Sequence, residues 1–230
     1  MNIKAVVFWL VCFGVCLPTS IAAQGTYQVG VLPSVNFNKK LANNWSLNFR
    51  VESRQLAFEG DFLGNNATNL DYVLTDFSLI AAKKVGLNSR IAGGYLTRFR
   101  DDEVVHRTIQ QYTIVQRMSG FRLAHRFTAD QTFTFNEKPE FRFRYRLTTE
   151  LPLNGQSADA KEFYLKVNNE LLNSFQGKEY DLELRLVPLL GYTVTDNHKL
   201  EIGPDYRLNR FLQSEARNRF WLSINWFIEL

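Results

Sequence analysis

Apolar and polar residues alternate along almost the whole chain, and this alternation constrains its fold more than any other feature. In Glu140–Leu151, EFRFRYRLTTEL, the residues Phe141, Phe143 and Tyr145 take every second position, and arginines lie between them. A period of two is typical of a β-strand whose two faces meet different surroundings. The chain is therefore expected to fold into a sheet with one apolar face and one charged face.

The same pattern recurs from end to end, which predicts one all-β domain over residues 24–230. It is clear in residues 45–55, 89–100, 121–127, 162–171, 180–192, 199–208 and 219–230, and weaker in 26–38, 70–85 and 106–117. No segment has a helical period, and no linker divides the chain. The runs suggest eleven strands, but a closed antiparallel barrel with both ends on one side needs an even number. We therefore expect 10–12 strands, with twelve as the best guess.

The N-terminus has the features of an export signal. Lys4 precedes the apolar run Ala5–Leu17, which is too short to span a membrane, and small residues follow it, with cleavage expected after Ala22 or Ala23. The sequence thus predicts a secretory signal peptide over residues 1–23. No later stretch approaches the length of a transmembrane helix.

Cysteine usage and charge exclude further classes of protein. Both cysteines, Cys12 and Cys16, lie in the signal, so the mature chain has no disulfide to stabilise it. Of the 27 Lys and Arg, Lys4 lies in the signal, which leaves 26 against 23 Asp and Glu and a net charge of +3. The basic residues are interleaved singly with apolar ones and form no basic run, so the sequence argues against nucleic-acid binding.

Two architectures share this alternation. A lipocalin-like carrier turns its apolar face inward around a ligand, whereas a membrane barrel turns it outward to lipid. Runs of about ten residues or more match the roughly 9–11 residues that cross a bilayer. Aromatic residues such as Trp45, Tyr206 and Trp226 lie near the expected strand ends, as interfacial girdles require. We therefore favour an antiparallel transmembrane β-barrel, with short and longer connections alternating between its two ends; the 151–162 connection is too long for the short side.

The mature chain also resembles a known family. Its segments NFRVESR, LAHRFTADQTF, FRFRYRL and YLKVNNEL are similar to those of an uncharacterised bacterial family, domain-of-unknown-function family 2490. Members of that family look like outer-membrane β-barrels, so the resemblance implies this fold. It implies no reaction, because the motifs describe the wall of a lumen.

The sequence carries no clear sign of catalysis. A lipid hydrolase of the outer membrane would need Ser and His together on the lipid-facing wall. His125 shares the apolar face, but Ser119 lies in the turn before it, and His106 and His198 lie at a strand end and in a turn. With no cysteine in the mature chain and dispersed histidines, we expect no metal site and no cofactor. A lipid-acting hydrolase and a soluble lipocalin-like carrier remain the alternatives.

The charged face carries the strongest functional hypothesis. Arginine rings favour anions in pores, but nearly balanced charges favour closed networks in a narrow or plugged lumen. We therefore expect a non-enzymatic outer-membrane barrel of a Gram-negative bacterium, with passage of small solutes as its candidate role. Its expected partners are outer-membrane lipid and the outer-membrane assembly machinery, and the sequence gives no indication of oligomeric state. The residues predicted to line the lumen are Arg50, Glu52, Arg54, Arg98, Arg126, Arg142, Arg144, Arg146, Glu150, Glu170, Glu183 and Arg185.

Overall fold

The computed structural model describes residues 25–101, 103–213 and 215–230, and the expected signal peptide over residues 1–23 lies outside them. The described residues form eleven β-strands. None of them forms a helix long and apolar enough to cross a membrane. The strands are β1 (Thr26–Lys40), β2 (Trp45–Asp61), β3 (Asn66–Lys84), β4 (Ser89–Arg100), β5 (Glu103–Met118), β6 (Phe121–Phe133), β7 (Glu140–Pro152), β8 (Phe163–Gln176), β9 (Glu179–Thr195), β10 (His198–Asn209) and β11 (Arg217–Glu229).

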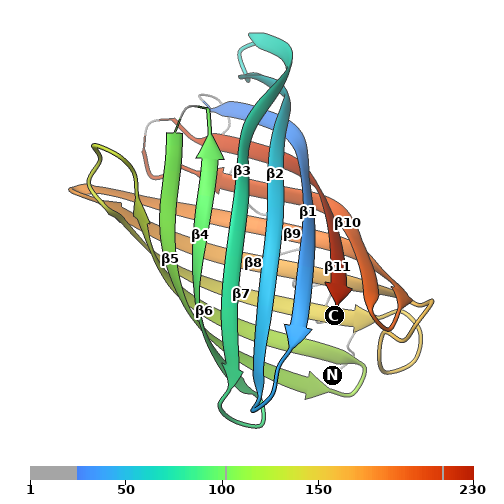
Figure 1. Ribbon diagram of the computed structural model, residues 1–230. Helices are drawn as coiled ribbons and strands as arrows, with labels where there is room; N and C mark the ends of the chain where they lie inside the picture. Colours follow the sequence, from blue (N-terminus) through green and yellow to red (C-terminus); the bar gives the residue numbers. More distant parts are fainter. Residues whose placement is uncertain (1–24, 102, 214) are drawn as a thin grey trace.

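These strands form one closed barrel in which each strand pairs with its neighbours in the sequence (Figure 1). The ten pairs from β1–β2 to β10–β11 are antiparallel, as expected from the alternation and the short connections. The barrel closes through β1 and β11, and these two strands run parallel, from Thr26↔Arg217 to Asn38↔Glu229.

The parallel closure explains why the strand number differs from the best guess of twelve. An even number is required only if the first and last strands are antiparallel, and odd-stranded membrane barrels are known. Here β1 and β11 run in the same direction, so an odd number of strands, eleven, closes the sheet. The start of β1 and the end of β11 therefore lie at opposite ends of the barrel. The eleven strands counted in the sequence are therefore all present, and the added parity requirement was wrong.

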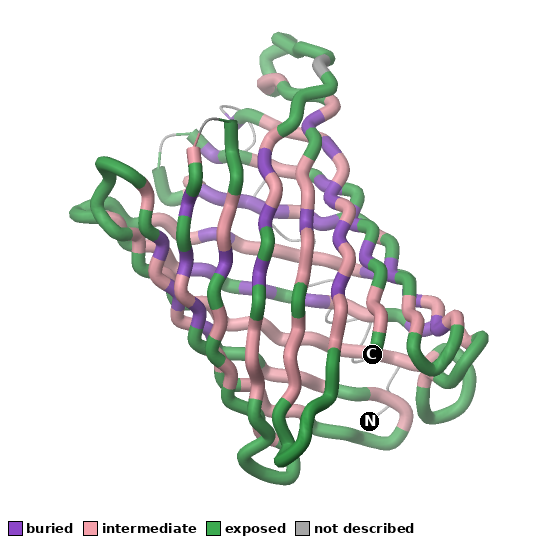
Figure 2. The backbone as a smooth tube through the Cα atoms, viewed as in Figure 1, coloured by how far each residue is buried: buried purple, intermediate pink, exposed green. Residues whose placement is uncertain are grey.

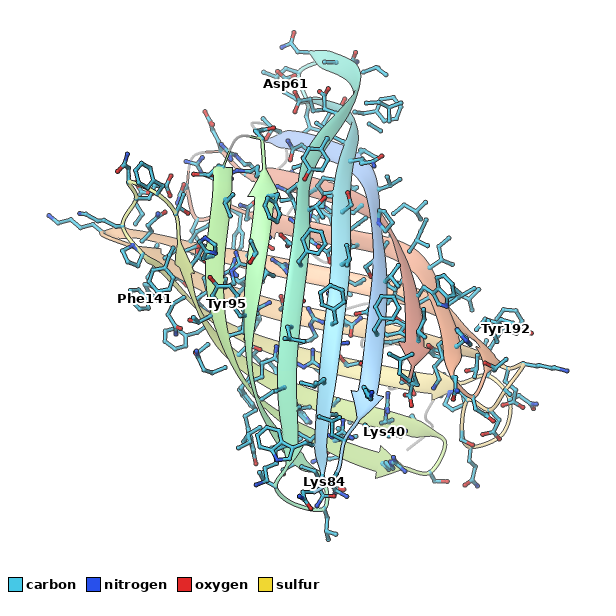
Figure 3. The ribbon with its side chains drawn as sticks, viewed as in Figure 1. Lys40, Asp61, Lys84, Tyr95, Phe141 and Tyr192 are labelled. Atoms are coloured by element: carbon cyan, nitrogen blue, oxygen red, sulfur yellow. The ribbon has the colours of Figure 1, made fainter. Side chains whose placement is uncertain are left out.

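The two faces of the wall differ as the alternation predicts. Buried and exposed residues alternate along most strands (Figure 2). Large apolar side chains such as Phe141 and Leu171 are exposed on the outside, and the labelled Phe141 and Tyr192 point away from the barrel (Figure 3). Charged and polar side chains such as Asp130 and Glu170 are buried on the inside. This is the reverse of the arrangement in a lipocalin-like carrier.

The connections alternate between the two ends of the barrel, but their lengths do not separate as expected, since the connections over 62–65 and 177–178 at one end are as short as the turns at the other. At one end, marked by Lys40 and Lys84 in Figure 3, short turns span residues 41–44, 85–88, 119–120 and 196–197. The 153–162 loop lies at this same end, as expected from its place in the chain. It is fixed to the neighbouring strand, because Lys161 N donates to Thr193 O (2.6 Å) and Thr193 N donates to Glu162 O (3.0 Å).

At the other end, the β2–β3 hairpin rises beyond the rest of the barrel, with Asp61 near its tip (Figures 1 and 3). The Asp61 carboxylate accepts hydrogen bonds from the Asn65 side chain (2.7 Å) and from the backbone N–H groups of Leu63 (2.9 Å) and Asn65 (3.1 Å). These bonds, the Asn65 side-chain bond foremost, hold the pKa of Asp61 below its usual range.

Proline removes a donor from the ladder, so Pro33, Pro188 and Pro204 would be expected from the sequence to mark bulges or strand ends, but all three lie inside strands. Pro188 and Pro204 lie inside β9 and β10, and the paired positions on either side of Pro204 keep the same register. The β9–β10 ladder omits its pairs between Ile202 and Tyr206, since proline has no N–H to donate. Gly203 allows the two backbones to approach there, because a Cβ at this position would overlap the carbonyl oxygen of Pro188.

Candidate functional site

The inner wall of the barrel carries the charged residues singled out in the sequence. All twelve lie at positions that alternate with the outward apolar residues of their strands, and eleven of them form ion pairs with other inward side chains. Arg126 is the exception within the described residues. The twelve are Arg50, Glu52, Arg54, Arg98, Arg126, Arg142, Arg144, Arg146, Glu150, Glu170, Glu183 and Arg185.

Carboxylates and arginines lie at different depths in this wall. The carboxylates are short and covered: Asp130 is 0 % exposed and Glu170 is 5 % exposed. The difference is clearest for Arg50 and Arg146, whose side chains are 36 % and 31 % exposed, against 9 % and 4 % for their partners Glu52 and Glu170. At these two positions the arginine is therefore more accessible from the interior than its carboxylate.

Arg126 indicates that the interior contains accessible space. Its charge interacts with Arg146, Glu170 and Arg144 and with Arg50 from a distant strand, so protein surrounds it. The residue is nevertheless exposed to solvent. Enclosure and exposure together mean that solvent-accessible space extends inside the barrel at this position.

Asp130 on β6 holds together the largest ion-pair network. Its carboxylate lies 2.6 Å from Arg142 Nε, 2.7 Å from a terminal nitrogen of Arg144 and 3.6 Å from Arg107 Nε. Arg107 also donates to the Thr132 hydroxyl (2.9 Å). One buried carboxylate thus pairs with three arginines from β5 and β7, which leaves the network positive.

Glu170 and Glu52 act in the same way. Glu170 accepts from Arg146 Nε (2.7 Å) and lies 3.0 Å from Arg185, and Glu52 bonds both Arg50 and Arg54 (3.0 Å). Around these two carboxylates and Asp130, seven arginines share three negative charges. Two further contacts, from Glu183 to Arg185 and from Glu140 to Arg142 at 3.9 Å, reduce the surplus without removing it.

Several inward charges were not predicted as lumen-lining residues. Asp76 binds Arg98 through two hydrogen bonds of 2.7 Å, and Asp205 binds Arg207 through two of 2.8 Å. The sequence did contain a signal for them: they lie at the same alternate positions, on the same or a neighbouring strand, as the residues that were predicted to face the lumen. The unpredicted charged residues that form ion pairs on this wall are Asp76, Arg107, Arg122, Asp130, Glu140, Lys166, Asp205 and Arg207.

Strand register places arginines directly opposite one another. Along one row, the paired positions are Arg126↔Arg146 and, after Glu170, Arg185↔Arg207 and Arg207↔Arg219. Like charges at directly opposite positions destabilise a sheet. A row of five arginines and one glutamate therefore lowers the stability of the sheet. Such destabilising arrangements are expected at functional sites.

The histidines lie on the outer face, near aromatic residues. His125 Nδ1 is 2.9 Å from the Tyr145 hydroxyl, and His106 Nδ1 is 2.8 Å from the Tyr95 hydroxyl. His198 packs against Trp226, with 6.0 Å between ring centroids. Within the described residues no serine is hydrogen-bonded to a histidine, so the Ser–His arrangement needed by a lipid hydrolase is not assembled there. Those residues also contain no group of three His, Cys, Asp or Glu placed to hold a metal ion.

Comparison with known proteins gives one match. A family model described as "Protein of unknown function (DUF2490)" matches residues 29–226, which span all eleven strands in whole or in part. No curated protein and no solved structure matches the chain. The family model covers most of the chain and the whole of the barrel apart from its two ends, so the protein is a member of the DUF2490 family.

Proposed function

We propose that this protein is a non-enzymatic barrel of the Gram-negative outer membrane that allows small anions to pass through its lumen. The observation that carries the proposal is the depth difference on the inner wall. Guanidinium groups such as those of Arg50 and Arg146 extend into the interior, whereas the carboxylates lie buried behind them. Positively lined pores attract anions and raise their local concentration.

The outer face supports the membrane location. Large apolar side chains are exposed on ten of the eleven strands, β2 to β11, among them Phe49, Leu79 and Ile224. Soluble monomers rarely expose apolar patches larger than a few hundred Å², so a continuous band needs an apolar phase around it. The strands are 12 to 19 residues long, enough for the roughly 9–11 residues that cross a bilayer at a tilt. Both observations fit an export signal at residues 1–23.

The strand number supports small solutes. Barrels of about eight strands are filled by their side chains, and those of 16–18 strands leave a wide aqueous channel. Eleven strands lie between these cases, and long arginine side chains narrow the interior further. The lumen therefore suits small solutes and excludes large ones.

Single-channel recording tests the proposal. The purified mature chain is inserted into planar bilayers with a tenfold gradient of potassium chloride, and the reversal potential reports which ion carries the current. We expect anion preference, reduced in Arg126→Glu and unchanged in Lys39→Glu. Lys39 is a matched control because it is exposed at the end of β1, away from the inner wall. A barrel without conductance, or one that prefers cations, would contradict the proposal.

A further inference from the structure

Four arginines from three strands converge inside the barrel, and we call Arg50, Arg126, Arg144 and Arg146 the arginine cluster. Arg126 on β6 and Arg146 on β7 are directly opposite each other in register, and Arg144 is the next inward residue on β7. Arg50 belongs to β2, which is separated from β6 by three strands, yet its charge acts on Arg126. The cluster therefore forms where side chains from separate parts of the wall approach across the lumen.

The cluster has more donors than its surroundings can satisfy. Arg126 has no hydrogen bond or ion pair to any side chain within the part of the chain that the structure describes. Each guanidinium carries five N–H donors. The three nearby carboxylates, Glu52, Asp130 and Glu170, pair with Arg50, Arg144 and Arg146 of the cluster, and each is shared with at least one further arginine. The buried Nε atoms of Arg50 and Arg144 and the buried oxygens Asp130 Oδ2 and Glu170 Oε1 have no hydrogen-bond partner among the same residues.

We infer that the arginine cluster is a binding site for a tetrahedral oxyanion with two or more negative charges, such as phosphate or sulfate. Guanidinium groups bind such oxyanions through pairs of parallel N–H···O bonds, and charge-assisted bonds of this kind are stronger than neutral ones. Chloride carries only one negative charge and has no set of oxygen atoms to meet several forks at once. The bound oxyanion supplies acceptors to the exposed donors of Arg126 and offsets the repulsion between Arg126 and Arg146.

This site specifies the solute class of the proposed passage and in that respect rests on the proposed function. Binding itself is measurable without conduction. The mature chain folded in detergent is titrated with inorganic phosphate and with sulfate by isothermal titration calorimetry. Sodium chloride at matched ionic strength serves as the reference.

Three variants test the residues. Arg126→Gln is expected to weaken phosphate binding at least tenfold, and Arg126→Lys to weaken it less, because lysine keeps the charge and loses the planar fork. Lys39→Gln removes one positive charge from an exposed position outside the cluster and is expected to bind phosphate as the unaltered protein does. Arg126→Gln is also expected to fold normally and to unfold at a higher temperature than the parent without phosphate, since Arg126 has no carboxylate to lose and one repulsion is removed.

Two results would overturn the assignment: equal heats for phosphate and chloride in the unaltered protein, or undiminished phosphate binding by Arg126→Gln. The outcomes also separate the site from the passage. Phosphate binding by a barrel that conducts no ions refutes the proposed function and retains the site. If the unaltered protein forms an anion-selective channel, but it binds phosphate no more tightly than Arg126→Gln and Lys39→Gln do, the site is refuted and the function is retained.

Discussion

Replacing Asp130 by Asn is expected to destabilise the barrel more than any other single charge removal on the inner wall. Asp130 is 0 % exposed, and Arg142 and Arg144 lie 2.6 and 2.7 Å from its carboxylate, with Arg107 at 3.6 Å. Asparagine keeps the shape of the side chain and removes its charge. Three guanidinium groups then repel one another around a neutral amide.

The magnitude follows from the burial of the pair. Removing one partner of a buried ion pair costs about 3–5 kcal/mol, because it leaves the other charge uncompensated. Solvent inside the lumen screens the arginines in part, so we expect a loss of about 3 kcal/mol. Glu150→Gln is the matched control. Its partner Arg122, at 2.6 Å, has a side chain that is 45 % exposed, and exposed pairs contribute about 1 kcal/mol or less.

The assay is urea unfolding of each variant folded into lipid vesicles, followed by tryptophan fluorescence. The reasoning predicts that Asp130→Asn lowers the free energy of unfolding clearly more than Glu150→Gln does. Adding Arg142→Gln to Asp130→Asn should recover part of the loss, because one repelling charge is removed. Equal losses for Asp130→Asn and Glu150→Gln would refute the view that Asp130 organises the network.

Three further predictions concern other parts of the wall. Gly191→Ala should cost about 1–3 kcal/mol in the same unfolding assay, because its new Cβ would overlap the ring of Tyr164, which packs flat against this glycine. Acidification should loosen the β2–β3 hairpin, because the pKa of Asp61 is lowered in the folded state: its stabilising effect is present above the unfolded pKa and is lost as the pH falls through the folded one. The protection of amides around Asn65 against hydrogen exchange, relative to their intrinsic rate at each pH, should fall there and show no such step in Asp61→Asn. His125→Ala should leave phospholipid vesicles as intact as the parent protein does, since no serine partner is bonded to this histidine within the described residues; lipid hydrolysis that the substitution abolishes would revive the enzymatic alternative.

Alternation was sufficient to predict the strands and the contents of each face. Apolar residues at every second position, as in EFRFRYRL, predicted β7 and its outward Phe141 and Phe143, which are exposed in the structure. The alternation could not predict how the first and last strands pair to close the sheet. Whether β1 meets β11 parallel or antiparallel is decided by backbone pairing between the two ends of the chain, and hydropathy carries no information on it.

The centre of the charge network was missed for a local reason. The alternation of β6 was followed only to Phe127, whereas the strand continues to Phe133 and includes Asp130. Beyond Phe127, the polar residue Gln131 takes an outward position and interrupts the apolar alternation. Gln131 is accommodated on the outer face because its side-chain amide and that of Gln110 exchange hydrogen bonds of 3.1 and 3.2 Å. Register is the other missing element, since a single sequence does not show that Arg126 lies opposite Arg146.

Cysteine labelling at two adjacent residues determines whether the charged face lines an aqueous lumen and the apolar face contacts lipid. Residues 24–230 contain no cysteine, so Arg126→Cys and Phe127→Cys each introduce a single thiol into a chain that lacks residues 1–23 after export. In outer membranes that contain the protein, Arg126→Cys should react with a membrane-impermeant anionic thiol reagent, and faster than with its cationic counterpart. Phe127→Cys should react only with a lipid-soluble reagent. The opposite pattern, with Phe127→Cys open to the impermeant reagents and Arg126→Cys protected from them, would contradict the account.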